Sequence, residues 1–243
     1  MVSEQVPRPR RGRQAEAERN DRLVLDAARE VFTARGFDAP VAAVAERAGV
    51  GMGSLYRRYG SKSDLLRRLC VLAMEQAIEA ADVALAAADP WEGLAGYVRA
   101  SVGFRSGALA PLAGTIETTP EMWQTSRRAR RLLQEVVARA SREGALRPDV
   151  TALDVTWLIE LFSRQSPGRP GPEDENVRRR LLAIALDGLR ARDAEPLPEP
   201  PPSAQAYEER WRHPSKAAAV RPRGPRVIAS LPPPAPGGSA GCT

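Results

Sequence analysis

A short stretch near the N-terminus carries most of the side chains that could bind an anionic polymer. It reads Met52-Gly53-Ser54-Leu55-Tyr56-Arg57-Arg58-Tyr59, and Lys62 follows three residues later. Arginine can donate paired hydrogen bonds to guanine or phosphate, and serine, tyrosine and lysine can donate to phosphate oxygens. The residue types favour hydrogen bonding to DNA. The candidate contact residues are Met52, Gly53, Ser54, Tyr56, Arg57, Arg58 and Lys62.

Two short helices around a glycine turn are expected to hold this stretch. Apolar spacing predicts helices over residues 41–48 and 52–58, separated by Gly49-Val50-Gly51. Leu55 and Tyr59 lie four residues apart, so they share the inward face of the second helix. This is the pattern of a helix-turn-helix, whose second helix enters the major groove of DNA.

A longer helix is expected on each side of this pair. Asn20 or Asp21 caps the first one, and Gly36 ends it. Ser61 caps the second, with Asp64 three residues later as its capping partner. The apolar face of the first helix comprises Val24, Ala27, Ala28, Val31 and Phe32.

The rest of the chain is also expected to be helical, which makes the fold class all-α. Apolar residues recur at three- and four-residue spacing, without an alternating β-branched run. Helix starts are expected at Asp89-Pro90, Thr119-Pro120 and Pro148-Asp149. Three apolar stripes require partner helices. They comprise Leu132, Leu133, Val136, Val137 and Ala140; Trp157, Leu158, Leu161 and Phe162; and Val177, Leu181, Ile184, Ala185 and Leu189.

Several of these segments resemble one family. Val44-Ala45, Ala48-Gly49-Val50, Ser54-Leu55-Tyr56, Tyr59, Ser61-Lys62 and Leu65-Leu66 closely resemble the TetR family of transcriptional regulators. This resemblance covers residues 21–70. Asp89-Pro90-Trp91 and the stretch from Leu146 to Asp154 are similar to the SbtR-like class of TetR C-terminal domains.

The resemblance assigns roles to the candidate residues. It implies that Ser54, Tyr56 and Lys62 hold phosphates. It also implies that Met52, Gly53 and Arg57, with Arg58 as a further candidate, read or lie over bases. Pro40-Val41 departs from the family pattern, because hydroxyl residues commonly begin the first motif helix there. A backbone contact made by those hydroxyls is expected to be missing.

The resemblance further implies a homodimeric repressor that a small-molecule effector releases from a palindromic operator. The expected dimer contact is formed by the last two long helices, near residues 151–166 and 173–191. Aromatic residues could line an effector pocket, although such residues at helical spacing more often belong to an ordinary core. The candidates are Trp91, Phe104, Trp123, Trp157 and Phe162.

The positive charge of the chain lies at its N-terminal end. Residues 1–70 hold 14 Lys and Arg against 9 Asp and Glu, whereas residues 71–190 hold 15 against 16. An acidic polymer would therefore dock at one end. The early arginines fit two interpretations equally well, a solvated arm and a segment that follows the minor groove. They are Arg8, Arg10, Arg11 and Arg13.

The scarcity of histidine and cysteine weighs against catalysis and metal binding. His213 is the one histidine and receives no role, and Cys70 and Cys242 lie too far apart to indicate a disulfide framework. Cys70 is expected to be a core residue. No enzymatic activity, metal or cofactor is expected. Because no secretory signal or apolar run of 18 residues occurs, we expect a cytoplasmic protein that does not bind membranes.

Composition divides the chain into four expected parts. Twelve of the 22 prolines lie between Pro196 and Pro236, a stretch that cannot bury enough apolar surface to fold. Within it, Ala204 to Trp211 could form one short docked helix. The parts are a disordered basic arm (1–19), a helix-turn-helix DNA-binding domain (20–65), a helical ligand-binding and dimerisation domain (66–192) and a disordered Pro-rich tail (193–243).

Two other functions compete with an effector-released repressor. A DNA-binding adaptor would sense nothing and would recruit a protein partner through the Pro-rich tail. An open cavity within residues 71–192 favours sensing, whereas a fully filled body favours the adaptor. An all-helical enzyme is the other alternative, but the chain offers no phosphate loop or recognisable metal spacing to support it.

Overall fold

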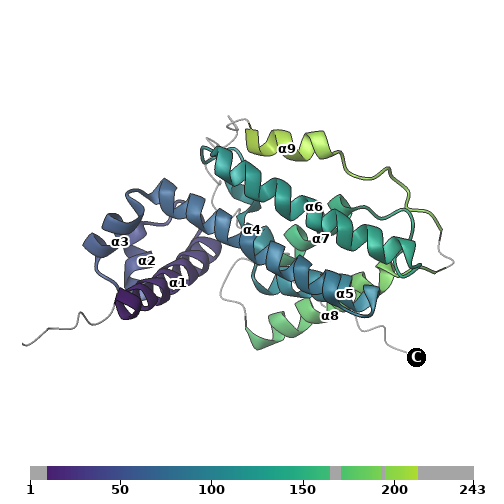
Figure 1. The fold of residues 1–243 in the computed structure, drawn as a ribbon, viewed down its shortest axis with the longest axis horizontal. Coiled ribbons are helices and arrows are strands. Elements are labelled where there is room, and N and C mark those ends of the chain that lie inside the picture. The colour runs from purple at the N-terminus through teal and green to yellow at the C-terminus, as the bar shows by residue number, and fades with distance from the viewer. Residues whose placement is uncertain (1–9, 165–170, 193–194, 213–243) are drawn as a thin grey trace, which may run out of the picture.

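The computed structural model describes residues 10–164, 171–192 and 195–212, and these ranges fold into helices without strands. Figure 1 shows α1 to α3 as a small unit at one end, with α4 leading from it into a larger helical body. The expected all-α fold is confirmed. The helices are α1 (Arg10–Arg35), α2 (Val41–Ala48), α3 (Met52–Tyr59), α4 (Lys62–Ala86), α5 (Pro90–Gly103), the 3₁₀ helix η1 (Ser106–Leu112), α6 (Pro120–Arg142), α7 (Ala152–Ser163), α8 (Pro172–Leu189) and α9 (Ala204–Arg212).

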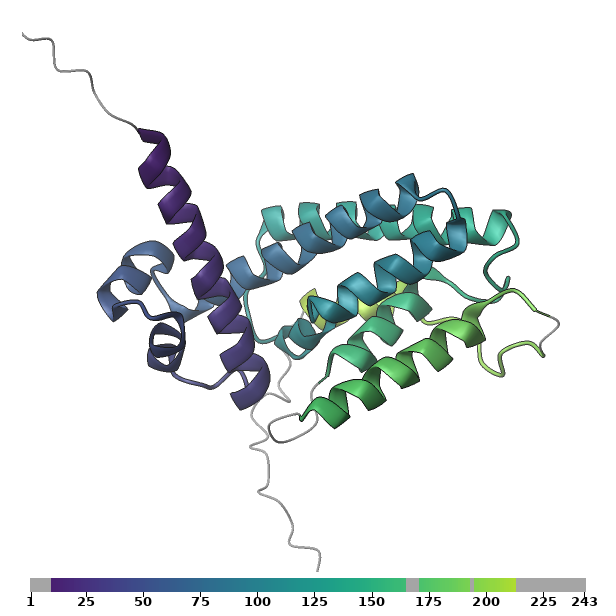
Figure 2. The same ribbon diagram turned by 90° about the horizontal axis from the view of Figure 1, so that it is seen from below.

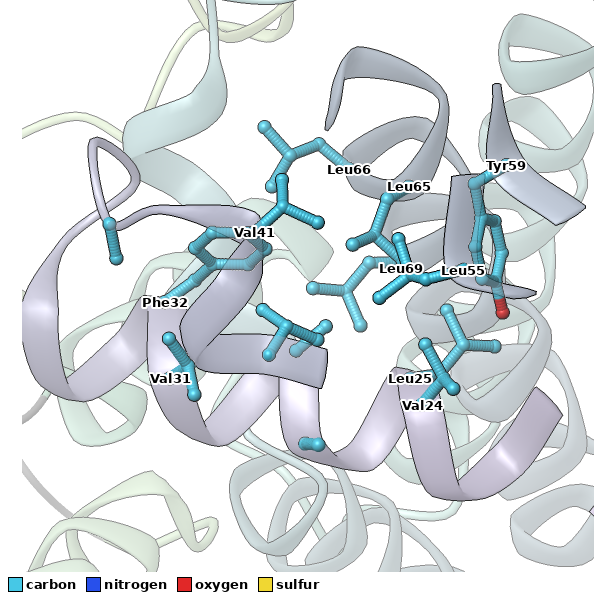
Figure 3. Packing of buried hydrophobic residues seen from close by; sticks show 14 of the residues in the cluster. Val24, Leu25, Val31, Phe32, Val41, Leu55, Tyr59, Leu65, Leu66 and Leu69 are labelled. Atoms are coloured by element: carbon cyan, nitrogen blue, oxygen red, sulfur yellow. The ribbon is translucent and has the colours of Figure 1, made fainter. Parts of the chain in front are cut away.

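The small N-terminal unit is built around the apolar face of α1. Phe32 and Leu25 are buried there against residues of α2, α3 and the first turns of α4. Figure 3 shows Leu55 and Leu65 directed into the same core. Since burying a leucine or phenylalanine side chain contributes about 1.5–3 kcal/mol, this cluster fixes the angle between α1 and α3.

The first helix begins earlier than its sequence pattern indicates. It starts at Arg10, so the expected start at Asn20 or Asp21 is wrong, and residues 10–19 are helical instead of belonging to a disordered arm. The physical reason is helix propensity, because this stretch is rich in Ala, Glu, Gln and Arg. Arg8 lies outside the described residues, as does the rest of the chain before Arg10.

The larger body is a helical bundle with its own core. Leu94 and Val98 of α5 are fully buried between α4 and α6, together with Val136, Val155 and Leu146. Helix α4 contributes to both cores, since its N-terminal residues belong to the small unit and its later turns to the body. It is therefore a continuous mechanical link between the two parts.

Capping residues decide where the body helices begin. Asp89 accepts hydrogen bonds from the backbone N–H groups of Trp91 and Glu92, and Thr119 accepts one from Met122, so those two predicted starts are confirmed. The start predicted at Pro148-Asp149 is wrong. Helix α7 begins at Ala152, because Thr151 and Asp154 form a reciprocal capping box.

The last body helix exposes most of its predicted apolar stripe. Val177, Leu181 and Ile184 of α8 are half or more exposed, whereas Leu182 and Leu186 face the core. Figure 2 shows α8 along the outer edge of the body, where no other described helix covers it from outside. The chain by itself therefore leaves this face of α8 without an apolar partner.

Part of the expected disordered tail is folded. Residues 195–203 lead to α9, which lies against the body beside α6 (Figure 1), so a fully disordered tail from residue 193 is wrong. The docked helix considered for Ala204 to Trp211 is confirmed. It is held by aromatic and ionic side chains, which a proline-rich composition does not reveal. His213 and residues 214–243 lie outside the described residues.

Candidate nucleic-acid interface and cavity

The turn between α2 and α3 depends on a glycine. Gly49 has φ of 67°, in the left-handed region, and Val50 N–H donates to the Ala45 carbonyl at 3.0 Å. Other residues adopt this conformation at a cost of about 1 kcal/mol, so glycine favours the tight reversal. The turn places α3 across α2, and the outer face of α3 is left exposed by the other described elements.

Helix α3 has the two faces that its sequence predicts. Leu55 is 2% exposed and Tyr59 is 8% exposed, and Figure 3 shows both directed towards α1. On the opposite side, Met52 and Tyr56 are 37% and 45% exposed. Gly53 has open space where a side chain would begin, so another molecule can approach its backbone closely.

The polar residues of α3 are not equally available for binding. Ser54 and Arg57 are both exposed, and Arg57 Nη2 donates to Ser54 Oγ at 3.3 Å. Arg58 is turned the other way, because its Nε donates to Asp21 Oδ1 of α1 at 2.5 Å. Arg57 can therefore meet a ligand directly, while Arg58 first orders α3 against α1.

Asp21 is a site residue that the sequence pattern did not identify. Its carboxylate also accepts a hydrogen bond from the Tyr59 hydroxyl. Burial alone would raise the pKa of Asp21, but the hydrogen bonds from Arg58 and Tyr59 outweigh this effect, and its pKa lies below the ordinary 3.8. The sequence pattern suggested Asp21 as a helix cap. Because α1 begins at Arg10, Asp21 instead lies within the helix, where its carboxylate holds α3 against α1.

Lys62 occupies the first turn of α4, beside the C-terminal end of α3. The residue is half-buried, and its ammonium group lies 5.6 Å from the centre of the Phe32 ring. A cation at a helix N-terminus is unfavourable with respect to the helix dipole, and an approaching anion would relieve that repulsion. Ser61 caps the helix as predicted, accepting a hydrogen bond from Asp64 N–H at 3.1 Å.

The body contains a cavity of about 170 Å³ between α4, α5, η1, α6 and α7, with α9 at its rim. Most of its lining is apolar and comes from small side chains of α4 and from leucine and isoleucine on the facing helices. Gly107 of η1 allows the backbone of η1 to approach α7 closely, since a Cβ there would lie 2.5 Å from Glu160 Cα. The polar residues in the lining include Tyr97, Ser101, Arg130, Glu160 and Tyr207.

None of the five aromatic residues predicted for an effector pocket lines this cavity. Trp91 is buried in the body core beneath Arg190, and Phe104 is exposed at the end of α5. Trp123 donates to Thr118 Oγ1, Trp157 packs edge-on against Tyr207, and the Phe162 carbonyl accepts from Arg178. The aromatic residues fill the core or the outer layer, and smaller side chains leave the space.

Cys70 is a core residue, as predicted. It is buried, and burial raises the pKa of its thiol to about 12. It belongs to the core that includes α1 to α3 and it also lines the cavity. Cys242 lies outside the described residues.

Known families match both parts of the chain. The family described as "Bacterial regulatory proteins, tetR family" matches residues 24–69, and "Transcriptional regulator SbtR-like, C-terminal domain" matches residues 89–191. No curated protein matches the sequence. In the described residues, no helix is both long and apolar enough to cross a membrane.

Several solved structures are similar over nearly their whole length. A TetR transcription regulatory protein from Mycobacterium vanbaalenii is 28% identical, with a TM-score of 0.53; the match covers 73% of this chain and 98% of that one. The ketosteroid transcriptional regulator KstR2 of Mycobacterium tuberculosis is 26% identical, with a TM-score of 0.51 and coverage of 72% and 96%. A TetR regulator from Streptomyces coelicolor shares the fold at 24% identity, with a TM-score of 0.52 and coverage of 70% and 98%.

Proposed function

This chain belongs to the TetR family of DNA-binding transcriptional regulators, and from this membership we propose that it is a homodimeric repressor released from a palindromic operator by a small-molecule effector. The observation that carries the proposal is the outer face of α3. It combines exposed Met52, Tyr56 and Arg57 with open space at Gly53, while Leu55 and Tyr59 anchor the helix to the core. Because operator DNA is chromosomal, we place the repressor in the cytoplasm.

The contact roles follow from the positions of the side chains. Arg57 is the candidate for paired hydrogen bonds to a guanine, and Met52 and Gly53 lie on the same outer face. Ser54, Tyr56 and Lys62 are suited to phosphate oxygens at the two ends of α3. Arg58, which pairs with Asp21, positions α3 and has a phosphate contact as a secondary role.

Dimerisation is supported by the apolar face of α7 and α8. Leu161 is 60% exposed and Leu181 is 50% exposed, and Val177 and Ile184 extend the same apolar surface. Large exposed apolar side chains grouped on neighbouring helices are typical of a surface that another protein covers. A twofold-symmetric contact here would present two α3 helices to half-sites about 34–36 Å apart, or a multiple of one DNA turn.

Effector release is supported by the cavity and by its connection to α4. Cys70, Met74 and Ala77 of this helix line the cavity, and the first turns of α4 pack in the core beneath α3. A ligand must bind the released state more tightly to shift the equilibrium, by roughly 5.5 kcal/mol for near-complete reversal. The open cavity favours sensing over the adaptor function, which would leave it without a purpose.

Binding to DNA across a salt series tests the proposal. The full-length protein is titrated onto a duplex from the region upstream of its own gene and onto a scrambled duplex of equal length, and the series is repeated on duplexes selected from a random pool. We expect a salt-dependent dimer complex that prefers the upstream or a selected palindromic sequence. Absence of DNA binding at low salt, or equal binding to all selected sequences, would contradict a sequence-specific repressor.

A further inference from the structure

Glu160 of α7 is a buried carboxylate at the cavity, on a residue that is 3% exposed. A buried charge is costly unless a counter-charge and hydrogen bonds accompany it. Its Oε1 atom accepts no well-formed hydrogen bond within the part of the chain that the structure describes, and the Tyr207 hydroxyl of α9 is the uncharged donor that faces the carboxylate. The hydrogen bonding of this carboxylate is therefore incomplete, and a better-placed donor could complete it.

The counter-charge of Glu160 comes from α9. Arg210 approaches only Oε2, with Nη1 at 3.4 Å and Nη2 at 3.3 Å. Both distances are longer than the 2.7–2.9 Å usual for a charge-assisted hydrogen bond. Arg210 therefore neutralises the carboxylate through a weak, one-sided contact that a better donor can replace.

Aromatic rings surround this pair and suit a cation. The Arg210 guanidinium lies 4.4 Å from the centre of the Trp157 ring and 5.3 Å from that of Tyr207. Tyr97, Tyr207 and Trp211 also line the cavity. Aromatic faces attract positive charge, so they favour an ammonium or guanidinium group beside Glu160.

Helix α9 is attached to the body through partly exposed side chains. It buries no residue fully, and it lies beyond residue 191, where the SbtR-like match ends. Arg130 of α6 pairs with Glu208, and Arg210 pairs with Glu160, so the described contacts of α9 are largely ionic and aromatic. Such contacts at a partly exposed surface are individually weak.

We propose that the cavity binds an organic cation whose charged group replaces Arg210 at Glu160, and that α9 is a lid carrying a built-in competitor for this ligand. Arg210 is 30% exposed, so its side chain can move to solvent while Arg130 stays paired with Glu208. The proposal rests on the proposed effector function in taking this cavity as the effector site.

The cavity volume limits the size of the cation. A cavity of 150 Å³ can hold benzene, so about 170 Å³ accommodates a single ring with a short amine chain. Phenethylammonium is a suitable probe, with 2-phenylethanol as its neutral counterpart and 3-phenylpropanoate as an anionic one. The three probes present a similar apolar body and differ mainly in charge.

Isothermal titration of the full-length protein without DNA tests the charge preference. We expect phenethylammonium to bind more tightly than either counterpart. The variant Arg210→Ala should bind it about fivefold or more tightly than the wild type, because the internal competitor is gone. The double variant Glu160→Gln/Arg210→Ala should lose the preference for the cation over 2-phenylethanol.

Two controls distinguish the loss of the competing Arg210 from a general loosening of α9. Glu208→Gln is the matched control, because it breaks the other ion pair between α9 and the body, as well as the Arg212–Glu208 pair within α9, and leaves Arg210 in place. It should not match the gain of Arg210→Ala. Circular dichroism and thermal melting must show that each variant is folded. A preference for 3-phenylpropanoate, no gain in Arg210→Ala, or no binding of the amine to that variant would overturn the proposal.

Failure of this inference is distinguishable from failure of the proposed function. If phenethylammonium binds as expected and selected operator DNA stays bound, the cation site stands and effector release fails. If an uncharged or anionic ligand releases the operator through this cavity, effector release stands and the cation site is overturned.

Discussion

Asp21 joins the first helix to the recognition helix at the scale of single residues. Its half-buried carboxylate on α1 accepts hydrogen bonds from Arg58 and Tyr59 of α3. Because these bonds hold its pKa below 3.8, the ionised carboxylate stabilises the folded state. The stabilisation by Asp21 is fully present at pH values above the pKa of this carboxyl in the unfolded chain. It is lost as the pH falls through the lower pKa of the carboxyl in the folded protein.

The variant Asp21→Asn is expected to destabilise the protein by about 1–2 kcal/mol, since an amide keeps the shape but not the charge. Urea unfolding followed by circular dichroism measures the loss. The difference from wild type should be constant from about pH 5 to 8 and should narrow below about pH 4. A difference that grows on acidification would contradict the assigned role of the carboxylate.

Lys62 and Arg57 should respond differently to substitution, because one is assigned to phosphate and the other to a base. Lys62→Ala should weaken binding equally on all duplexes and reduce the salt slope by about one. Arg57→Ala should cost about 1–3 kcal/mol on the preferred operator and relax preference at particular positions. Fluorescence anisotropy on an operator and its single-base variants separates the two effects.

Arg99→Ala is a suitable control for both variants. Arg99 is exposed on α5 and pairs with Glu92, away from α3. The variant Arg99→Ala removes one positive charge, as Arg57→Ala does, but leaves the DNA-binding face of α3 unchanged. Its affinity for the operator should therefore change little. If Arg57→Ala leaves every base preference intact, Arg57 is not a base-reading residue.

At the scale of helices, local signals predicted most elements and failed where two signals competed. Asp89 and Thr119 begin helices as expected, because a capping residue and a following proline agree. At residues 148–154 Asp149 and Thr151 both qualify as the N-cap; Thr151 caps α7, and Asp149 instead accepts hydrogen bonds from Arg147 and from Leu197 N–H. The hydrogen bond from Leu197 joins residues 48 positions apart, so no local sequence pattern could predict it.

The exposed face of α8 predicts the assembly state. Leu181→Arg should prevent dimerisation, because burying an unpaired charge in an apolar contact is costly. We expect a folded monomer by analytical ultracentrifugation and circular dichroism, with operator affinity reduced roughly tenfold or more through the loss of bivalent binding.

Val83→Arg is the matched control for Leu181→Arg. Val83 is an exposed apolar residue on α4, away from the α7 and α8 surface. This variant should remain dimeric and bind DNA normally. A dimeric Leu181→Arg protein would show that the subunits meet elsewhere.

At the scale of the whole molecule, the two sites differ in how far the sequence could predict them. The DNA-binding face lies within eleven consecutive positions, 52–62, where helical spacing separates inward from outward residues. The cavity takes residues from six separate helices, and Glu160 faces Arg210 across 50 positions. Such a site follows from tertiary packing, which explains why the predicted aromatic residues do not line it.

Long-range contacts couple the small unit to the body. Arg29 of α1 donates to the Phe104 carbonyl at 3.1 Å, and Arg67 of α4 donates to the Glu117 carbonyl at 3.2 Å. Trp211 of α9 packs against the core that includes α1 to α3, although α9 also borders the cavity. Because this core also includes Leu109 and Leu112 of η1 and Met122 of α6, Trp211 links α9 to the packing shared by the small unit and the body.

A chain that ends after Ser203 lacks α9 and therefore tests what the lid contributes to ligand binding and to DNA binding. This end point retains residues 195–203, which are anchored by Arg147 to the Glu195 carbonyl and by Leu197 N–H to Asp149. Loss of Trp211 packing should lower the free energy of unfolding by about 1–3 kcal/mol. Phenethylammonium should bind less tightly than to Arg210→Ala, because this chain lacks the competitor Arg210 but also lacks Tyr207 and Trp211 of the cavity wall.

Operator binding of this shortened chain should stay within about twofold of wild type, since α3 and the apolar face of α8 are intact. Titration of the amine and of operator DNA, each on the same folded preparation, measures both quantities. An amine affinity equal to that of Arg210→Ala, with retained operator binding, would show that the aromatic residues of α9 do not contribute to the cation site. Loss of operator binding in a folded dimer would instead make α9 part of the DNA-binding unit, through the contact of Trp211 with its core.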